Sequence, residues 1–179
     1  EHDTLPDLGC GDGRVLRCAA RQVGCRCVGV DVDSSLLETA RREASREQVG
    51  ELCSWLLADF RSAEVERALA QASCAVVFLV PGALHVVAQV LQTHYRTRLR
   101  DGGAGSRAEG SAAGPLCVVS MVYHFSEASE LSVVRSDPLW RLAVVSGHAA
   151  DEPRQLAVGC SKPEGVALCG IRCHRWHGV

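Results

Sequence analysis

The sequence has almost no lysine and few aromatic residues. Lys162 is the only lysine among the 179 residues, the 18 arginines are spread along the chain, and the formal net charge is −2. Proteins that bind nucleic-acid phosphates usually concentrate positive charge on one face. The even spread of arginine therefore makes a nucleic-acid partner less expected, without excluding one.

The chain also lacks a run of eighteen apolar residues and a charged leader followed by an apolar segment. We therefore expect neither a membrane span nor a secretion signal. The ten cysteines lie within apolar or strand-like runs of a chain long enough to form a core without disulfides. These features predict an intracellular, reducing location, either cytoplasmic or mitochondrial.

No C-x-x-C pair occurs, so the late cysteines and histidines do not predict a metal site. These residues are Cys160, Cys169, Cys173, His174 and His177.

Short apolar runs alternate with segments of helical periodicity, a pattern typical of a parallel sheet with helices on both faces. The last two runs have no helix between them and predict an antiparallel pair. We predict an α/β fold, Rossmann-like and doubly wound, with a mostly parallel seven-stranded sheet and an antiparallel edge hairpin. The expected strands are 5–8, 26–32, 54–58, 74–80, 116–123, 140–146 and 166–173.

The expected first helix is 14–23, and a capping box at Ser35–Glu38 is expected to open the second. Residues 1–179 are predicted to form a single domain. The stretch 102–114, rich in Gly, Ala and Ser, is expected to be a flexible insertion. Glu1 lies only six residues before the first motif, so an upstream segment is expected to precede it.

A glycine-rich motif, D-L-G-C-G-D-G-R, occupies residues 7–14, where the first strand should turn into the first helix. Glycine lets the backbone pass close beneath a ligand, because it has no Cβ to collide with it. Asp31 follows at the end of the second strand, 22 positions after Gly9. A carboxylate there can accept hydrogen bonds from two ribose hydroxyls, so the pair predicts a nucleoside-binding crevice.

The spacing of the glycines disfavours a dinucleotide. The motif G-x-G-x-x-G would place its third glycine at position 14, which is an arginine, whereas the third glycine here is Gly13. NAD and FAD are therefore disfavoured. The sequence also lacks G-x-x-x-x-G-K-[ST], so a phosphate-binding P-loop is absent.

These residues resemble the class I S-adenosylmethionine-dependent methyltransferases, whose first motif is an acidic residue followed by G-x-G-x-G. The resemblance implies S-adenosylmethionine as cofactor, with Asp7 and the glycines around its methionine part and Asp31 on its ribose. The segment 57–60 resembles a further family signature, which would place the Asp59 carboxylate on the adenine amino group and the Phe60 backbone beside the ring. The predicted cofactor-binding residues are Asp7, Gly9, Cys10, Gly11, Gly13, Asp31, Val32, Asp59 and Phe60.

A closer resemblance, over roughly residues 7–125, is to protein-lysine N-methyltransferases that include archaeal enzymes and the mitochondrial ATP-synthase c-subunit lysine methyltransferase. The matching segments are G-D-G-R at 11–14, V-V-F-L-V-P at 76–81 and V-V-S at 118–120. This resemblance implies lysine N-methylation of a protein. The family also carries an upstream aromatic-Val-Pro-Thr signature, which would precede Glu1.

The methyl acceptor is expected to bind at the carboxyl end of the fourth strand, where α/β crevices hold ligands. The substrate-binding candidates are Leu79, Val80, Pro81 and, just past the fifth strand, Tyr123. No catalytic residue is singled out, because methyl transfer depends mainly on positioning. Asp12 has two interpretations, a contact with the cofactor's amino group or a cap of the first helix.

Two alternatives to a protein-lysine methyltransferase stay open at this point. One is a small-molecule or RNA methyltransferase on the same scaffold, and the other is a non-catalytic binding module. Methylation of a nucleic-acid base amino group by the familiar route is disfavoured, since the tetrapeptide [DN]-P-P-[YF] is absent.

Overall fold

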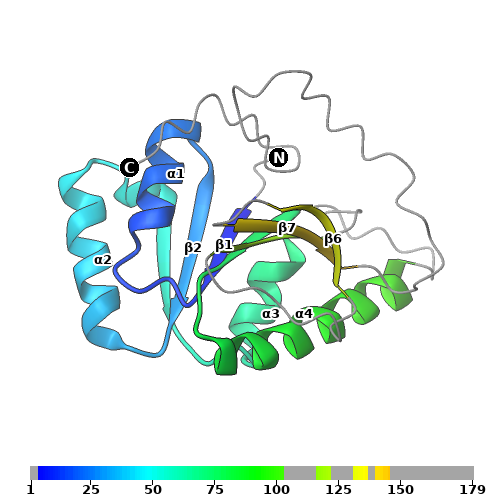
Figure 1. The fold of residues 1–179 in the computed structure, drawn as a ribbon. Coiled ribbons are helices and arrows are strands. Elements are labelled where there is room, and N and C mark those ends of the chain that lie inside the picture. The colour runs from blue at the N-terminus through cyan, green and yellow to red at the C-terminus, as the bar shows by residue number, and fades with distance from the viewer. Residues whose placement is uncertain (1–3, 103–115, 122–130, 137–139, 146–179) are drawn as a thin grey trace, which may run out of the picture.

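The computed structural model describes residues 4–102, 116–121, 131–136 and 140–145 (Figure 1). Its strands form one sheet in the order β3-β2-β1-β4-β5-β7-β6. The elements are β1 Thr4–Leu8, α1 Arg14–Val23, β2 Arg26–Asp31, α2 Ser34–Arg46, the 3₁₀-helix η1 Gly50–Leu52, β3 Cys53–Leu57, α3 Ala63–Ala70, β4 Cys74–Val77, α4 Pro81–Gly102, β5 Cys117–Met121, β6 Leu131–Ser136 and β7 Trp140–Val145.

The first five strands are parallel, with β1 between β2 and β4, β3 beside β2 and β5 beside β4. The mostly parallel α/β class predicted from the sequence is confirmed. β7 pairs antiparallel with β5 and with β6. The sequence pattern predicted that 140–146 pairs with 166–173 and did not predict β6. The register of β6 against β7 shifts between Val133 and Arg135, so its side chains do not follow a simple alternation. Residues 166–173, and most of the expected insertion at 102–114, lie outside the described residues.

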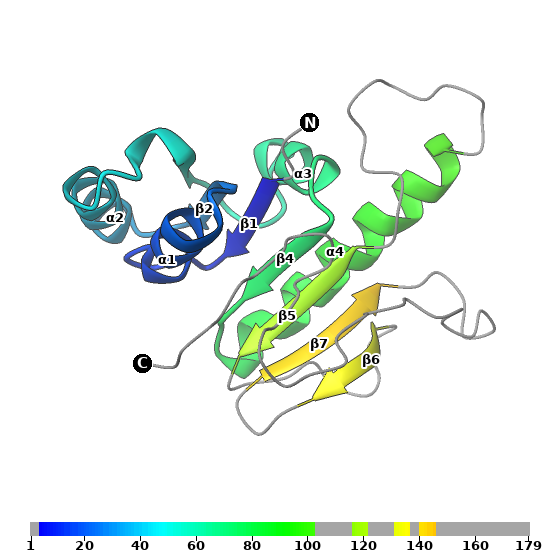
Figure 2. The ribbon, with the colours of Figure 1, turned by 90° about the horizontal axis from the view of Figure 1, so that it is seen from above.

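The sheet is covered by helices on both faces. α1 and α2 lie on one side and α3 and α4 on the other, as the two views show (Figures 1 and 2). Each helix buries an apolar stripe. In α2 this stripe includes Leu37, whereas the sequence pattern predicted Leu36, which is 38% exposed. The buried residues are Leu16, Ala19 and Ala20 of α1, Leu37, Ala40 and Ala44 of α2, Val65, Ala68 and Leu69 of α3, and Leu84, Val87, Ala88 and Leu91 of α4.

Several predicted boundaries need correction. The capping box at Ser35 is wrong, because the N-cap of α2 is Asp33, whose carboxylate accepts from the backbone N–H groups of Ser35 and Leu36. β4 ends at Val77 rather than at residue 80, since α4 begins at Pro81 and the chain must turn before it. β3 runs one residue earlier than expected.

Pro6 lies in β1, a central strand, where a missing N–H would normally break a ladder. The pairing of β1 with β4 covers only Asp7 and Leu8, so Pro6 stands before that ladder begins. The parallel arrangement then brings the carboxyl ends of β1, β2, β3 and β4 to one edge of the sheet. This edge carries the predicted cofactor-binding residues.

Candidate functional site

The glycine motif forms a loop that folds over the end of β2. The backbone N–H groups of Gly9 and Cys10 both donate to the Val30 carbonyl, at 2.9 and 3.0 Å. Gly9 and Gly13 have φ angles of 87° and 73°, in the left-handed region that favours glycine. A Cβ built on Gly11 would meet no atom within 4 Å, so the loop leaves open space on its outer side.

Asp31 holds this loop to two neighbouring segments. Its Oδ2 accepts from the Gly11 N–H at 2.8 Å and its Oδ1 from the Asp33 N–H at 3.0 Å. Its backbone carbonyl accepts from the Ala58 N–H at 3.0 Å, just past the end of β3. Because an ionised carboxylate has about four acceptor positions, about two are left for ribose hydroxyls.

Asp7 is a buried carboxylate at the end of β1. Its side chain is only 2% exposed, and Oδ1 has no hydrogen-bond partner among the described residues. Burial, and then the negative charge of Asp31, raise the pKa of Asp7 to about 7. A buried acceptor with no partner is costly, so Asp7 fits a cationic or hydrogen-bond-donating group, such as the ammonium or sulfonium of S-adenosylmethionine.

Asp59 lies at the exposed end of β3, paired with Arg61. The guanidinium donates from Nε to Oδ1 at 2.8 Å and from Nη2 to Oδ2 at 3.0 Å. Hydrogen bonds from Arg61 lower the pKa of Asp59 to about 2. The carboxylate is therefore a charged acceptor at neutral pH, as contact with an adenine amino group would require.

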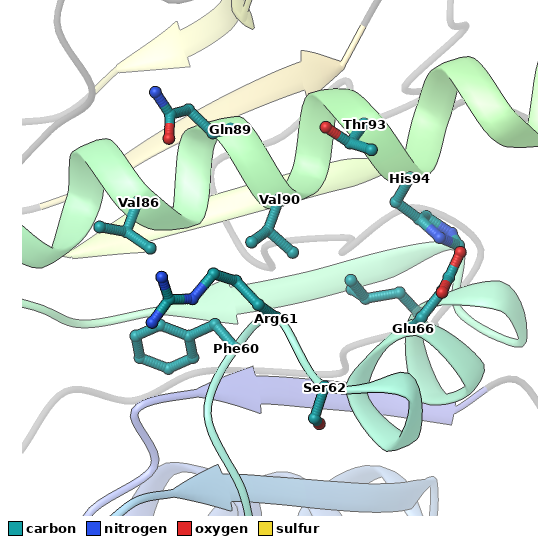
Figure 3. Close-up of a pocket in the computed structure, with 10 residues that line it drawn as sticks. Phe60, Arg61, Ser62, Glu66, Val86, Gln89, Val90, Thr93 and His94 are labelled. Atoms are coloured by element: carbon teal, nitrogen blue, oxygen red, sulfur yellow. The ribbon is translucent and has the colours of Figure 1, made fainter.

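Phe60 follows Asp59, three residues past the last residue of β3. It packs, partly buried, against the apolar core beneath α3 and α4. In Figure 3, Val86 and Val90 of α4 point toward Phe60 and Arg61. With its ring anchored there, Phe60 offers a ligand at the strand ends mainly its backbone.

A cavity of about 340 Å³ lies between α3 and α4. Of the predicted cofactor residues only Phe60 lines it, so this cavity is not the nucleoside site predicted at the strand ends. Figure 3 shows Glu66 of α3 directed toward His94 of α4 at one end. The remaining lining residues are Arg61, Ser62, Leu69, Val86, Gln89, Val90 and Thr93.

Large apolar side chains are exposed around the strand ends. Val32 is 68% exposed after β2, and Phe78 and Val80 are 49% and 64% exposed after β4. Phe78 was not among the predicted site residues, because the strand was expected to end at residue 80 and not at Val77. Leu79 packs against Gly9, so that a Cβ on this glycine would overlap its side chain.

Two other substrate candidates have different placements. Pro81 is exposed at the first position of α4, where its fixed φ suits a helix start. Tyr123 lies outside the described residues.

The indole of Trp55, in β3, packs against Gly13 of the glycine loop and against Gly29 of β2. The sequence did not predict this contact. A Cβ on Gly29 would lie 2.5 Å from Trp55 Cε3 and 2.8 Å from Cys10 Sγ. A Cβ on Gly13 would also overlap the indole and would come within 2.9 Å of Ala40 Cβ. The lack of side chains at Gly13 and Gly29 therefore makes room for the indole.

We expect Gly29→Ala to lower the free energy of unfolding by about 1–3 kcal/mol, because an added methyl group overpacks this contact. Urea denaturation measures the change. The matched control is Gly50→Ala, whose Cβ would meet its nearest atom, Ser45 Oγ, at 3.6 Å. Combining Gly29→Ala with Trp55→Leu should restore part of the loss. Equal costs at positions 29 and 50 would contradict the packing argument.

Asp12 lies just before Gly13, the N-cap of α1. Its Oδ1 accepts from the Arg14 backbone N–H at 3.2 Å, and its carboxylate pairs with the Arg14 guanidinium at 2.8 Å. These hydrogen bonds lower the pKa of Asp12. The carboxylate therefore binds Arg14, the first residue of α1.

Among the residues that the structure describes, six cysteines are reduced, namely Cys10, Cys18, Cys25, Cys27, Cys53 and Cys74. Cys117 is disulfide-bonded, so the expectation of reduced thiols fails for this residue. Within the described ranges, no group of three or more His, Cys, Asp or Glu residues is placed to hold a metal ion. The late cysteines and histidines from 160 to 177 lie outside those ranges.

In the part of the chain that the structure describes, none of the helices is both long enough and apolar enough to span a membrane.

Comparison with known families and structures agrees with this geometry. The model of the ANTKMT methyltransferase domain matches residues 7–100. This segment contains every predicted cofactor-binding residue. No curated protein sequence matches the chain.

Among solved structures, an RNA methyltransferase from Salinibacter ruber in complex with S-adenosyl-L-homocysteine is similar, with a TM-score of 0.63 and 22% identity. The similarity covers 84% of this chain and 85% of that one. A second, StiE O-MT residues 942–1257, has a TM-score of 0.51 and 12% identity, over 74% of this chain and 46% of that one. At these identities the likeness concerns the fold alone.

Proposed function

The chain belongs to the ANTKMT methyltransferase domain family, and we propose that it transfers the methyl group of S-adenosylmethionine to the ε-amino group of a lysine in a protein. The convergence of Asp7, Asp31 and the glycine loop at one edge of the sheet is the observation that supports S-adenosylmethionine as the cofactor. The family match supports the lysine part.

The residues present fit S-adenosylmethionine in charge and in hydrogen bonding. The buried Asp7 carboxylate lacks a hydrogen-bond partner for Oδ1 within the described residues and would face the positively charged end of the cofactor. Asp31 would accept from the ribose hydroxyls while its bond to Gly11 N–H keeps the loop in place. Asp59 and the Phe60 backbone would hold the adenine, and the exposed Val32 would contact its ring.

When bound, S-adenosylmethionine supplies a methyl group already activated by its sulfonium. The chain then has to position the acceptor amine in line with that methyl group and to exclude water. Leu79 lies against Gly9 and so connects the cofactor loop with the end of β4. The acceptor amine would approach the methyl group past Leu79.

The apolar side chains at the end of β4 suit a lysine acceptor. Phe78 and Val80 are exposed there, and no carboxylate lies between β4 and α4, in the segment 78–80. A lysine stem can pack along such a surface while its amino group reaches the methyl donor. Partial desolvation disfavours the ammonium form, which promotes the loss of the proton that an attacking amine requires.

The proposal predicts that labelled methyl groups from S-adenosylmethionine enter protein when the chain is added to cell extract. Protease should release the label, nuclease should not, and acid hydrolysis should yield N-methyl-lysine. The Asp31→Ala chain is the control and should transfer little label.

Each other outcome rejects a specific part of this proposal. Label released by nuclease would favour an RNA acceptor, and label in small molecules would favour a metabolite acceptor. Label in none of the fractions, although S-adenosylmethionine binds, would favour a binding module without transfer.

A further inference from the structure

Three cysteines gather at the amino ends of β2 and β3, at the edge of the sheet opposite to the cofactor residues. We call Cys25, Cys27 and Cys53 the thiol cluster. The Sγ atoms of Cys25 and Cys27 lie 3.8 Å apart. Cys27 and Cys53 are Cα partners on neighbouring parallel strands. All three are reduced in this structure.

The members of the thiol cluster differ in exposure. Cys27 is only 1% exposed, and its thiol also donates to the Leu16 carbonyl at 3.5 Å. Cys25 and Cys53 are partly exposed. A reagent from solution therefore meets Cys25 or Cys53 first, with Cys27 behind them.

The surroundings shift the pKa values of Cys53 and Cys27 in opposite directions. Hydrogen bonding with the Cys27 thiol lowers the pKa of Cys53, and the nearby Arg17 guanidinium lowers it further, against the opposing effects of burial, Cys25 and Glu47. Hydrogen bonds with Cys25 and with Cys53, and then burial, raise the pKa of Cys27. The thiolate is the reactive form of cysteine, so Cys53 is the favoured nucleophile.

We propose that the thiol cluster is a modification site for low-molecular-weight disulfides, at which Cys53 is attacked first and Cys27 completes an internal disulfide. Neighbouring strands lie about 4.8 Å apart, and disulfides usually join Cα atoms about 4.4–6.8 Å apart. Cα partners such as Cys27 and Cys53 lie in that range. The disulfide would join β2 to β3 two residue pairs before the contact between Gly29 and Trp55.

The reaction balances in two exchanges. The Cys53 thiolate attacks one sulfur of oxidised glutathione, forms a mixed disulfide and expels one glutathione thiolate. Cys27 then loses its proton, attacks the Cys53 sulfur and expels the second glutathione thiolate. Two protein thiols are oxidised, one glutathione disulfide is reduced, and the released protons go to the two glutathione thiolates.

Tryptic mapping of the folded chain after incubation with oxidised glutathione tests this proposal. Trypsin separates the three thiols, because Arg26 lies between Cys25 and Cys27, and places Cys53 in the peptide 47–61. We expect the peptide 27–41 to become linked to 47–61. A link between 22–26 and 27–41 would also support the site, since Cys25 can exchange with Cys27.

Variants separate this site from general thiol oxidation. Cys27→Ser should stop the reaction at glutathione bound to Cys53, whereas Cys18→Ser on α1 should react as the natural chain does. If Cys27→Ser does not fold, iodoacetamide labelling of the natural chain serves instead, and Cys53 should react several-fold faster than Cys18. Labelling of Cys53 no faster than that of Cys18, or glutathione incubation without any disulfide inside the cluster, would overturn the proposal.

Discussion

Replacement of Asp31 by alanine is expected to weaken binding of S-adenosylmethionine about 100-fold. Two ribose hydroxyls would lose a charged acceptor, at roughly 1.5 kcal/mol for each hydrogen bond, and about 1.4 kcal/mol corresponds to a factor of ten in affinity. The variant also removes the acceptor of the Gly11 N–H and so loosens the glycine loop. Both effects act at the strand edge and leave the buried core intact.

Isothermal titration with S-adenosylmethionine measures this loss, and circular dichroism verifies that the variant folds. Asp33→Ala is the matched control, since it removes the same charge two residues away. Asp33 caps α2, so its replacement should cost about 1 kcal/mol of stability and leave cofactor affinity nearly unchanged. Similar affinity losses in the two variants would show that the effect comes from net charge and not from a contact with the ribose.

Asp7 is expected to make the stability of the cofactor-free protein fall as the pH rises. Its carboxyl has a pKa of about 7 in the folded chain, against an ordinary value of 3.8. Between these values the folded state holds a proton that the unfolded state has lost. Unfolding then releases a proton, so the stabilising contribution present at low pH is lost as the pH rises through 7.

Urea denaturation from pH 5 to pH 8 measures this effect. The natural chain should lose roughly 2–3 kcal/mol over that interval, since one pKa unit corresponds to about 1.4 kcal/mol. Asp7→Asn has no such proton to release and should lose much less. Parallel pH curves for the two chains would contradict the assignment of a raised pKa to Asp7.

The same protonation affects cofactor binding. A positively charged ligand next to Asp7 favours the ionised carboxylate, so binding at neutral pH should release a proton. The affinity of the natural chain for S-adenosylmethionine should therefore increase from pH 6 to pH 8. The affinity of Asp7→Asn should be weaker and nearly independent of pH over that interval.

Local sequence patterns predicted the parts of the fold that depend on neighbouring residues. The helix Arg14–Val23 was predicted with its observed bounds, because its apolar stripe lies between the glycine motif and Gly24. The carboxylates of Asp7, Asp31 and Asp59 were predicted to converge, since parallel strands end at one edge. The structure places all three at that edge, at the ends of β1, β2 and β3.

Other features depend on contacts that local patterns do not specify. The packing of Trp55 on Gly29 follows from the register of β3 against β2, which pairs these two residues. The cap of α2 was assigned to Ser35, because a single sequence does not tell which of several nearby polar side chains in the segment 33–35 reaches the free N–H groups. Phe78 is exposed because β4 ends at Val77. The continuous apolar run 74–80 did not indicate that end.

The central claim is that one edge of the sheet binds S-adenosylmethionine through Asp7, Asp31 and the glycine loop. Isothermal titration of the folded chain with S-adenosylmethionine and, separately, with NAD tests it most directly. The claim predicts one saturable site for S-adenosylmethionine that is strongly weakened by Asp31→Ala, and no binding of NAD. Saturable binding of NAD without binding of S-adenosylmethionine would contradict it.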